Sequence, residues 1–268
     1  MRQMKQMQYW KIILLHILII IFVSGCASDK KELKENETFN AEDAFKKANE
    51  LIEKKDYEEA RKVLEEIRTK DSSQQYAPVA KLRIADTYFD NESYEEAATE
   101  YEAFLKTDPY NKYASYAQYK LALSYFKQIK TIDISYSTAQ KALSEFEKLQ
   151  RNYPRNPYME ITESRIKECR QMLAEYEFYV GDFYFKKGAY NAAAHRFNTL
   201  LKDYPGSIRE PEALYYLGLS YRDMGQHGLA YTTLQTLIKK FPSLEISSEA
   251  KEQLSSVGYL ILKSDNGK

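Results

Sequence analysis

One arrangement of small, apolar and aromatic residues recurs along most of the chain. Each copy has an Ala, a second small residue twelve positions before it, and an apolar residue seven positions after it. The four clearest copies are centred on Ala60, Ala97, Ala193 and Ala230. In three of them a Pro follows twelve positions after the Ala, where it would end a helix. The pattern predicts pairs of helices, and neighbouring copies such as Ala60 and Ala97 lie 37 residues apart.

This order resembles the tetratricopeptide repeat, a helix–turn–helix unit of about 34 residues in which small residues let the two helices approach closely. One such unit cannot bury its apolar face alone, so the units stack on one another. The sequence therefore predicts an all-α fold, a tetratricopeptide-repeat α-solenoid of about five helix–turn–helix units.

The third unit departs from the pattern. Its helices are predicted over residues 116–127 and 137–151, and about eight extra residues around 128–136 predict a longer turn between them. The next stretch, 158–173, contains neither Gly nor Pro and runs into the first helix of the fourth unit. We therefore expect one long connecting helix over 158–187 after the third unit.

The first 25 residues have the pattern of a secretory signal peptide. Basic residues precede a twelve-residue apolar run over 12–23, which is shorter than the roughly 20 residues that span a bilayer. The run ends in Val-Ser-Gly-Cys, which resembles the lipobox of bacterial lipoproteins. That resemblance implies removal of residues 1–25 by cleavage between Gly25 and Cys26, and acylation of Cys26.

Acylation would fix the chain to a membrane by its lipid. The residue after the cysteine is Ala27 rather than Asp, which in lipoprotein sorting favours the outer membrane. The remaining boundaries follow from these two patterns. We expect a lipidated N-terminus and tether over 26–40, N-terminal repeats 1–3 over 41–157, C-terminal repeats 4–5 over 174–245, and a capping helix and tail over 246–268.

Composition excludes several classes of function. The 39 basic and 39 acidic residues cancel, which argues against a nucleic-acid-binding protein. Two Cys and three His are too few for a closed zinc site of the usual kind. The chain has no Gly-x-Ser-x-Gly, no Gly-rich phosphate loop and no His-Glu-x-x-His. We therefore predict no catalytic residues, no metal site, no cofactor and no nucleic-acid partner.

In tetratricopeptide arrays the first helices of the units line a groove. With the small residue taken as position 8, positions 5, 9 and 12 face that groove, and here the lining is mainly aromatic or aliphatic. We therefore expect the groove to bind an apolar or aromatic segment of another protein. The alternative is that these side chains pack against neighbouring repeats and close the groove. The predicted groove residues are Phe45, Leu82, Phe89, Tyr119 and Phe126.

The order of lipobox, five units, a long helix after the third unit, and Tyr-Pro or Phe-Pro unit ends is similar to the BamD (YfiO/ComL) family of lipoproteins. The similarity covers roughly residues 22–245 and is closest over 146–154 and 175–190. It implies a lipid-anchored location on the periplasmic face of the outer membrane, within the β-barrel assembly machinery.

The resemblance also implies three kinds of partner. They are a BamA-like β-barrel insertase bound through its periplasmic domains, the other lipoproteins of the machinery, and unfolded outer-membrane proteins recognised by the N-terminal repeats. The C-terminal repeats would dock on the insertase through Phe178, Phe185, Tyr215 and Arg222.

Two other classes of protein share parts of this pattern. One is a periplasmic tetratricopeptide adaptor that couples cell-wall synthesis to the Tol–Pal system. Such adaptors usually carry an N-terminal coiled coil, and no sustained heptad run lies between residues 28 and 41. The other is a carbohydrate-handling enzyme, which would need paired carboxylates about 5–9.5 Å apart. Asp86 and Asp182 are two or more units apart and predict no such pair.

Overall fold

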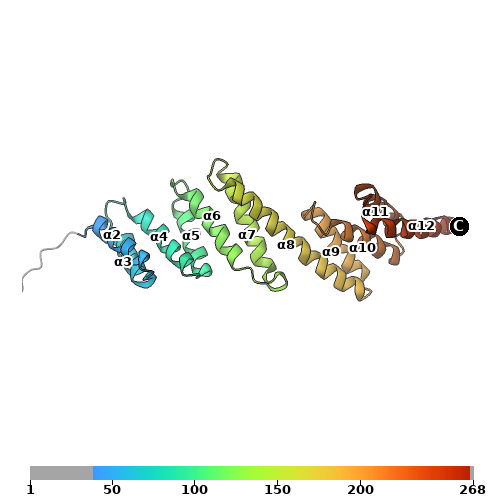
Figure 1. The fold of residues 1–268 in the computed structure, drawn as a ribbon, viewed down its shortest axis with the longest axis horizontal. Coiled ribbons are helices and arrows are strands. Elements are labelled where there is room, and N and C mark those ends of the chain that lie inside the picture. Colours follow the sequence, from blue (N-terminus) through green and yellow to red (C-terminus); the bar gives the residue numbers. More distant parts are fainter. Residues whose placement is uncertain (1–38, 266–268) are drawn as a thin grey trace, which may run out of the picture. The chain divides into compact units, whose positions relative to one another are not determined.

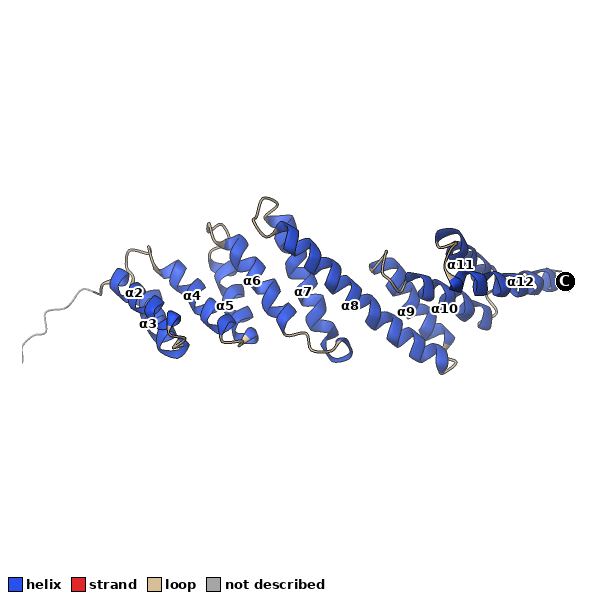
Figure 2. Cartoon of the chain, viewed as in Figure 1, coloured by secondary structure: helices blue, strands red, loops and turns tan. Residues whose placement is uncertain are grey.

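The computed structural model describes residues 39–265, and every regular element in that range is an α-helix (Figures 1 and 2). From Ala41 onward each helix packs against the next in chain order. The predicted all-α stack of helix pairs, with a long helix after the third pair, is confirmed. The first helices of the five units are α2 (Ala41–Glu53), α4 (Ala77–Asp90), α6 (Ala114–Lys127), α8 (Met159–Lys186) and α10 (Glu210–Asp223). The second helices are α3 (Tyr57–Lys70), α5 (Tyr94–Thr107), α7 (Ile132–Asn152), α9 (Tyr190–Asp203) and α11 (His227–Lys240), and α12 (Glu245–Asp265) follows them.

The small residue at position 8 sets the approach of the two helices within a unit. In the fourth and fifth units this residue is Gly181 or Gly218, and a methyl group at either site would lie 2.7 Å from a side-chain atom of Phe197 or Leu234. Both of those side chains are fully buried on the second helix. The close crossing therefore requires a residue with little or no side chain.

The turn inside four of the five units contains one residue with a left-handed backbone. It is Gly188 in the fourth unit and Gly225 in the fifth, with φ of 72° and 74°, but Lys55 in the first and Glu92 in the second, with φ of 60° and 59°. The next amide reaches back to the last turn of the first helix, as in the bond from the Ser93 N–H to the Tyr88 carbonyl. This is the hydrogen-bonding pattern of a Schellman motif, which ends the first helix at a fixed residue.

The expected long turn in the third unit is confirmed only in part. Residues 128–131 are non-helical, but Ile132–Ile134 form a short helical turn, and the non-helical backbone of Ser135 separates this turn from the rest of α7. The Lys130 N–H donates to the Ser135 hydroxyl at 3.2 Å, and the ring of Tyr136 packs 4.3 Å from that of Tyr176 on α8. Of this stretch, Tyr136 thus packs against the long helix, whereas the side chain of Ile134 is exposed.

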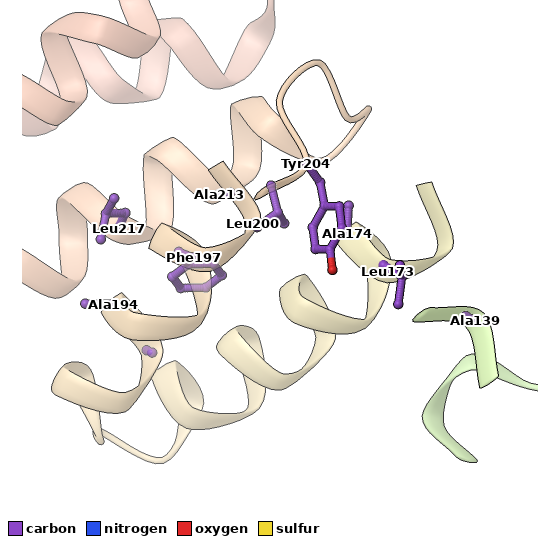
Figure 3. Close-up of a cluster of buried hydrophobic side chains, with 10 residues drawn as sticks. Ala139, Leu173, Ala174, Ala194, Phe197, Leu200, Tyr204, Ala213 and Leu217 are labelled. Carbon is purple, nitrogen blue, oxygen red and sulfur yellow. The ribbon is translucent and has the colours of Figure 1, made fainter. Parts of the chain in front are cut away.

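α8 joins the third and fourth units through a shared core. It packs on both α7 and α9, so one element completes two helix pairs. Figure 3 shows the resulting cluster, in which Leu173 and Ala174 of α8 lie among side chains of three other helices, including Phe197 of α9. A division into N-terminal and C-terminal repeats at α8 stays a prediction, because α8 contacts both sides.

Candidate partner-binding surfaces

The predicted groove residues lie where each first helix meets the first helix of the next unit. We call this row of contacts the first-helix ladder: α2 to α4, α4 to α6, α6 to α8, α8 to α10 and α10 to α12. At its start Phe45 packs against Tyr76, the residue before α4, with ring centroids 5.7 Å apart. Leu82 differs from the expectation. Leu82 is only 4% exposed within a core that α4 and α5 share with α6, so it does not offer a surface to a bound segment.

Phe89 is half-buried and carries a lysine over its ring. The Lys120 ammonium of α6 lies 3.4 Å from the ring centroid of Phe89, a close cation–π contact. Burial lowers the pKa of Lys120, while the carboxylates of Asp86 and Asp90 counteract that shift. The contact therefore joins an aromatic surface to a positive charge at the boundary of the second and third units.

A buried carboxylate organises the same boundary. Asp86 of α4 is 7% exposed, and it accepts hydrogen bonds from the Tyr101 hydroxyl at 2.6 Å and the Tyr116 hydroxyl at 2.8 Å. Burial raises the pKa of both phenols, so both stay protonated and act as donors. Since Tyr101 belongs to the same unit as Asp86 and Tyr116 to the next, the carboxylate ties two units together.

Tyr119 and Phe126 of α6 contact the N-terminal half of α8. Tyr119 stacks on Tyr158 with centroids 4.5 Å apart and planes 6° apart. The Arg165 guanidinium lies 4.8 Å from the Phe126 ring centroid, and its Nε atom is buried with no hydrogen-bond acceptor among the described residues. The two aromatic residues are half-buried, so they pack against the next helix and keep part of each ring exposed.

The ladder therefore has a feature that the sequence-based prediction missed. Lys120 and Arg165 place positive charge over the aromatic rings of Phe89 and Phe126. The sequence contains a signal for Lys120, because the residue two positions before the small residue is basic in the first three units and Tyr in the fourth and fifth. From the first unit to the fifth, the residues at this position are Lys46, Arg83, Lys120, Tyr179 and Tyr216.

The four residues expected to dock on a partner lie on the C-terminal part of the ladder and are half-buried. Phe178 and Phe185 of α8 both contact the ring of Tyr216, at centroid distances of 6.1 and 5.1 Å. Tyr215 packs beside Tyr216 at 5.5 Å. The Arg222 guanidinium donates to Asp223 and to Gln253 of α12. All four residues thus take part in contacts within the chain.

A second buried carboxylate holds the long helix in place. Glu177 of α8 is 1% exposed and accepts from the Tyr136 hydroxyl at 2.8 Å and from Arg196 at 3.2 Å. These donors come from α7 and α9, so one carboxylate links three helices. Such a network stabilises the fold only while every member keeps its partner.

Several other expectations concern chemistry or the membrane. Gly25 and Cys26 lie outside the described residues, so cleavage and acylation there stay predictions. No helix among residues 39–265 is long and apolar enough to cross a membrane. The same residues contain no group of three or more His, Cys, Asp or Glu side chains that could hold a metal ion. Cys169 is buried, and burial raises the pKa of its thiol to about 12.

Comparison with known proteins gives a family match and several relatives. The profile of the YfiO family, described as an outer membrane lipoprotein, matches residues 37–233. The chain is 32% identical over 119 residues to outer membrane protein assembly factor BamD of Xylella fastidiosa strain 9a5c. The aligned residues cover 43% of this chain and 41% of that protein. It is 33% identical over 84 residues to the BamD of Vibrio cholerae, covering 31% of this chain and 35% of that protein. The chain thus spans less than half the length of these relatives.

Solved structures with a similar backbone are tetratricopeptide proteins. One is a tetratricopeptide-repeat protein of Bacteroides fragilis, 14% identical with a TM-score of 0.47, covering 81% of this chain and 98% of that one. Another is the TPR2AB domain of yeast Sti1 in complex with an Hsp90 peptide, 13% identical with a TM-score of 0.43, covering 85% and 93%. At these scores and identities the likeness says nothing about what the chain binds.

Proposed function

The chain belongs to the YfiO family of outer membrane lipoproteins, and from this premise we propose that it is a non-enzymatic component of the machinery that assembles β-barrel proteins in the outer membrane. Its relatives in Xylella and Vibrio carry the name outer membrane protein assembly factor. In this proposal Cys26 carries the lipid that holds the protein on the periplasmic face. The helical body then presents surfaces to partners, and no bond is made or broken.

The observation that carries the proposal is the first-helix ladder of units two and three. Half-exposed rings of Phe89 and Phe126 lie directly beside the cationic groups of Lys120 and Arg165. An unfolded segment that ends in an aromatic residue offers both complementary groups, a ring for the aromatic surface and a carboxylate for the cation. We therefore assign recognition of unfolded barrel proteins to this part of the ladder, with Phe45 and Tyr119 beside it.

Docking on a BamA-like insertase is assigned to the C-terminal part of the ladder. Phe178, Phe185 and Tyr215 provide half-exposed aromatic surface, and Arg222 provides a partly exposed guanidinium. Aromatic residues and Arg are the side chains that most often dominate binding at protein interfaces. Anchoring beside an insertase would raise the local concentration of any segment that the ladder holds.

Two experiments test these assignments. The first is affinity purification of the full-length protein from detergent-solubilised membranes, with the bound proteins identified by mass spectrometry. We expect a stoichiometric β-barrel protein with periplasmic domains. Recovery of Tol–Pal or cell-wall synthesis proteins without that barrel would contradict the assembly role.

The second experiment measures binding of a labelled peptide that ends in Phe with a free carboxylate. Phe89→Ala combined with Phe126→Ala should weaken binding by about tenfold or more, because truncating a residue that dominates an interface costs over about 1 kcal/mol. Tyr110→Ala is the matched control, since Tyr110 is a 99% exposed aromatic in a turn outside the ladder. The amide-capped peptide should also bind more weakly. Equal binding of the two peptides would refute the role of Lys120 and Arg165.

A further inference from the structure

Two hollows lie side by side along the turn that joins α9 to α10, and Ile208 lines both of them. Each has a volume of about 830 Å³, including the solvent at its open mouth. The side chain of Ile208 is 72% exposed, although aliphatic side chains of this size are usually buried. We call the two hollows together with Ile208 the turn trough.

The first hollow lies between the N-terminal half of α8 and this turn, and it is mainly basic. Lys167 and Arg170 line it from α8, together with one acidic residue, Glu163. Arg170 is paired with Glu147, whereas Lys167 is exposed. This end of the trough therefore suits a negatively charged group.

The first hollow is also lined by a buried hydrogen-bond donor that has no acceptor among the residues the structure describes. The amide oxygen of Gln171 accepts from the Ile208 N–H at 3.2 Å and from the Ser207 hydroxyl at 3.3 Å. These two donors fix the orientation of the amide. Its nitrogen is then buried with no acceptor among the described residues. A carbonyl or carboxylate oxygen from a bound chain would satisfy it, which matters because an unmade buried hydrogen bond is costly.

The second hollow lies between α10 and the start of α12, and its charge is opposite. Glu212, Glu245 and Glu249 line it, and no basic residue of the described range does, while Tyr215 and the 42% exposed Leu244 supply apolar surface. Glu212 is partly neutralised by Arg209 at 3.3 Å. This end of the trough suits a positively charged side chain with an apolar stem, such as that of Lys or Arg.

We propose that the turn trough binds an extended segment of a partner polypeptide that carries an acidic group at one end, an apolar residue in the middle and a basic side chain at the other end. The acidic group lies beside Lys167, the apolar residue covers Ile208, and the basic side chain enters the hollow of Glu245 and Glu249. Neighbouring packed helices are about 8–10 Å apart. The path from α8 over α10 to α12 is therefore roughly 20 Å, or about six extended residues at about 3.3 Å each.

The assignment does not depend on the proposed assembly role. Its only residue in common with the docking surface proposed above is Tyr215, and none of its residues belongs to the ladder of units two and three. Binding of a short peptide to the purified protein can therefore succeed or fail independently of which machinery the chain joins.

Fluorescein-labelled six-residue peptides with capped ends test the proposal by anisotropy with the full-length protein in detergent. Three peptides share a Leu-Val centre and differ in the residue pairs at their two ends. The mixed-charge peptide has Glu-Glu at one end and Lys-Lys at the other, the diacidic peptide has Glu-Glu at both ends, and the dibasic peptide has Lys-Lys at both ends. We expect the mixed-charge peptide to bind about tenfold more tightly than the other two. Equal binding of the three peptides, or no binding of the mixed-charge one, overturns the proposal.

Two substitutions test which residues of the trough set affinity and specificity. Lys167→Glu makes both ends of the trough acidic, so the protein should then prefer the dibasic peptide by about tenfold. Ile208→Asp should weaken the binding of all three peptides. Lys202→Glu is the matched control, an exposed lysine of α9 that lines neither hollow. If Lys202→Glu changes the preference as much as Lys167→Glu does, the effect is one of net charge and the trough is not the site. Circular dichroism checks that each variant stays helical.

Discussion

Replacing Gly181 by Ala tests the helix crossing on which every unit depends. The added Cβ would lie 2.7 Å from Cε1 and 2.9 Å from Cδ1 of Phe197, whereas carbon atoms in ordinary contact are about 3.5–4.0 Å apart. The Phe197 ring would have to retreat by about 1 Å. It is fully buried between Phe178 and Tyr216, whose ring centroids are 5.9 and 6.0 Å away. These two rings therefore leave the Phe197 ring no room to move by this distance.

The expected change in the free energy of unfolding follows from two opposing effects. Forcing an extra carbon into a packed core costs about 1–3 kcal/mol, and Ala gains about 1 kcal/mol over Gly inside a helix. Gly181→Ala should therefore lower the free energy of unfolding by about 0–2 kcal/mol. Gly258→Ala in α12 is the control, because no atom of the described residues lies within 4 Å of its added Cβ. That variant should be stabilised by up to about 1 kcal/mol.

The assay is urea unfolding of the full-length protein, followed by far-ultraviolet circular dichroism. The two variants share the propensity gain, so the difference between them, about 1–3 kcal/mol, measures the crossing itself. Combining Gly181→Ala with Phe197→Leu should recover part of the loss, because the smaller side chain makes room. If Gly181→Ala stabilises the protein as much as Gly258→Ala does, close packing is not the reason for Gly at this position.

Three further predictions concern single residues. Glu92→Gly should raise the free energy of unfolding by up to about 1 kcal/mol in urea, since Glu92 has a φ of 59° that Gly adopts without strain. No change, or a decrease, would show that the backbone of Glu92 is not strained. Tyr101→Phe should cost about 1.5–3 kcal/mol, because the buried Asp86 carboxylate loses a donor at 2.6 Å; a loss below about 0.5 kcal/mol would mean that water replaces the hydroxyl. Asp71 accepts from the Ser73 hydroxyl and from the N–H groups of Tyr76 and Ala77 at the start of α4, and these bonds lower the pKa of its carboxyl. Because the folded-state pKa lies below the unfolded value of about 3.9, the stabilisation is present at neutral pH and is lost as the pH falls through that region. Asp71→Ala should therefore cost about 1–2 kcal/mol at pH 7 and progressively less below about pH 4, and a cost that does not change with pH would refute the assignment to the charged form.

The sequence by itself determined the repeating helix pairs and the long helix after the third pair. Both follow from local rules, since small residues at a fixed spacing specify a close helix crossing and an uninterrupted stretch of helix formers specifies a continuous helix. The sequence also indicated which positions lie on the first helices. These signals are readable because each is carried by residues close together in the chain.

Contacts between units were decided only by the tertiary structure. It buried Leu82 and placed Lys120 and Arg165 over aromatic rings. The two ring contacts depend on a partner about 30 or more residues away, as in the pairing of Phe89 with Lys120. Spacing within one unit specifies which side of a helix faces inward. How far a side chain is covered depends on what the next unit places against it, because burial is a property of packed neighbours and not of the local sequence.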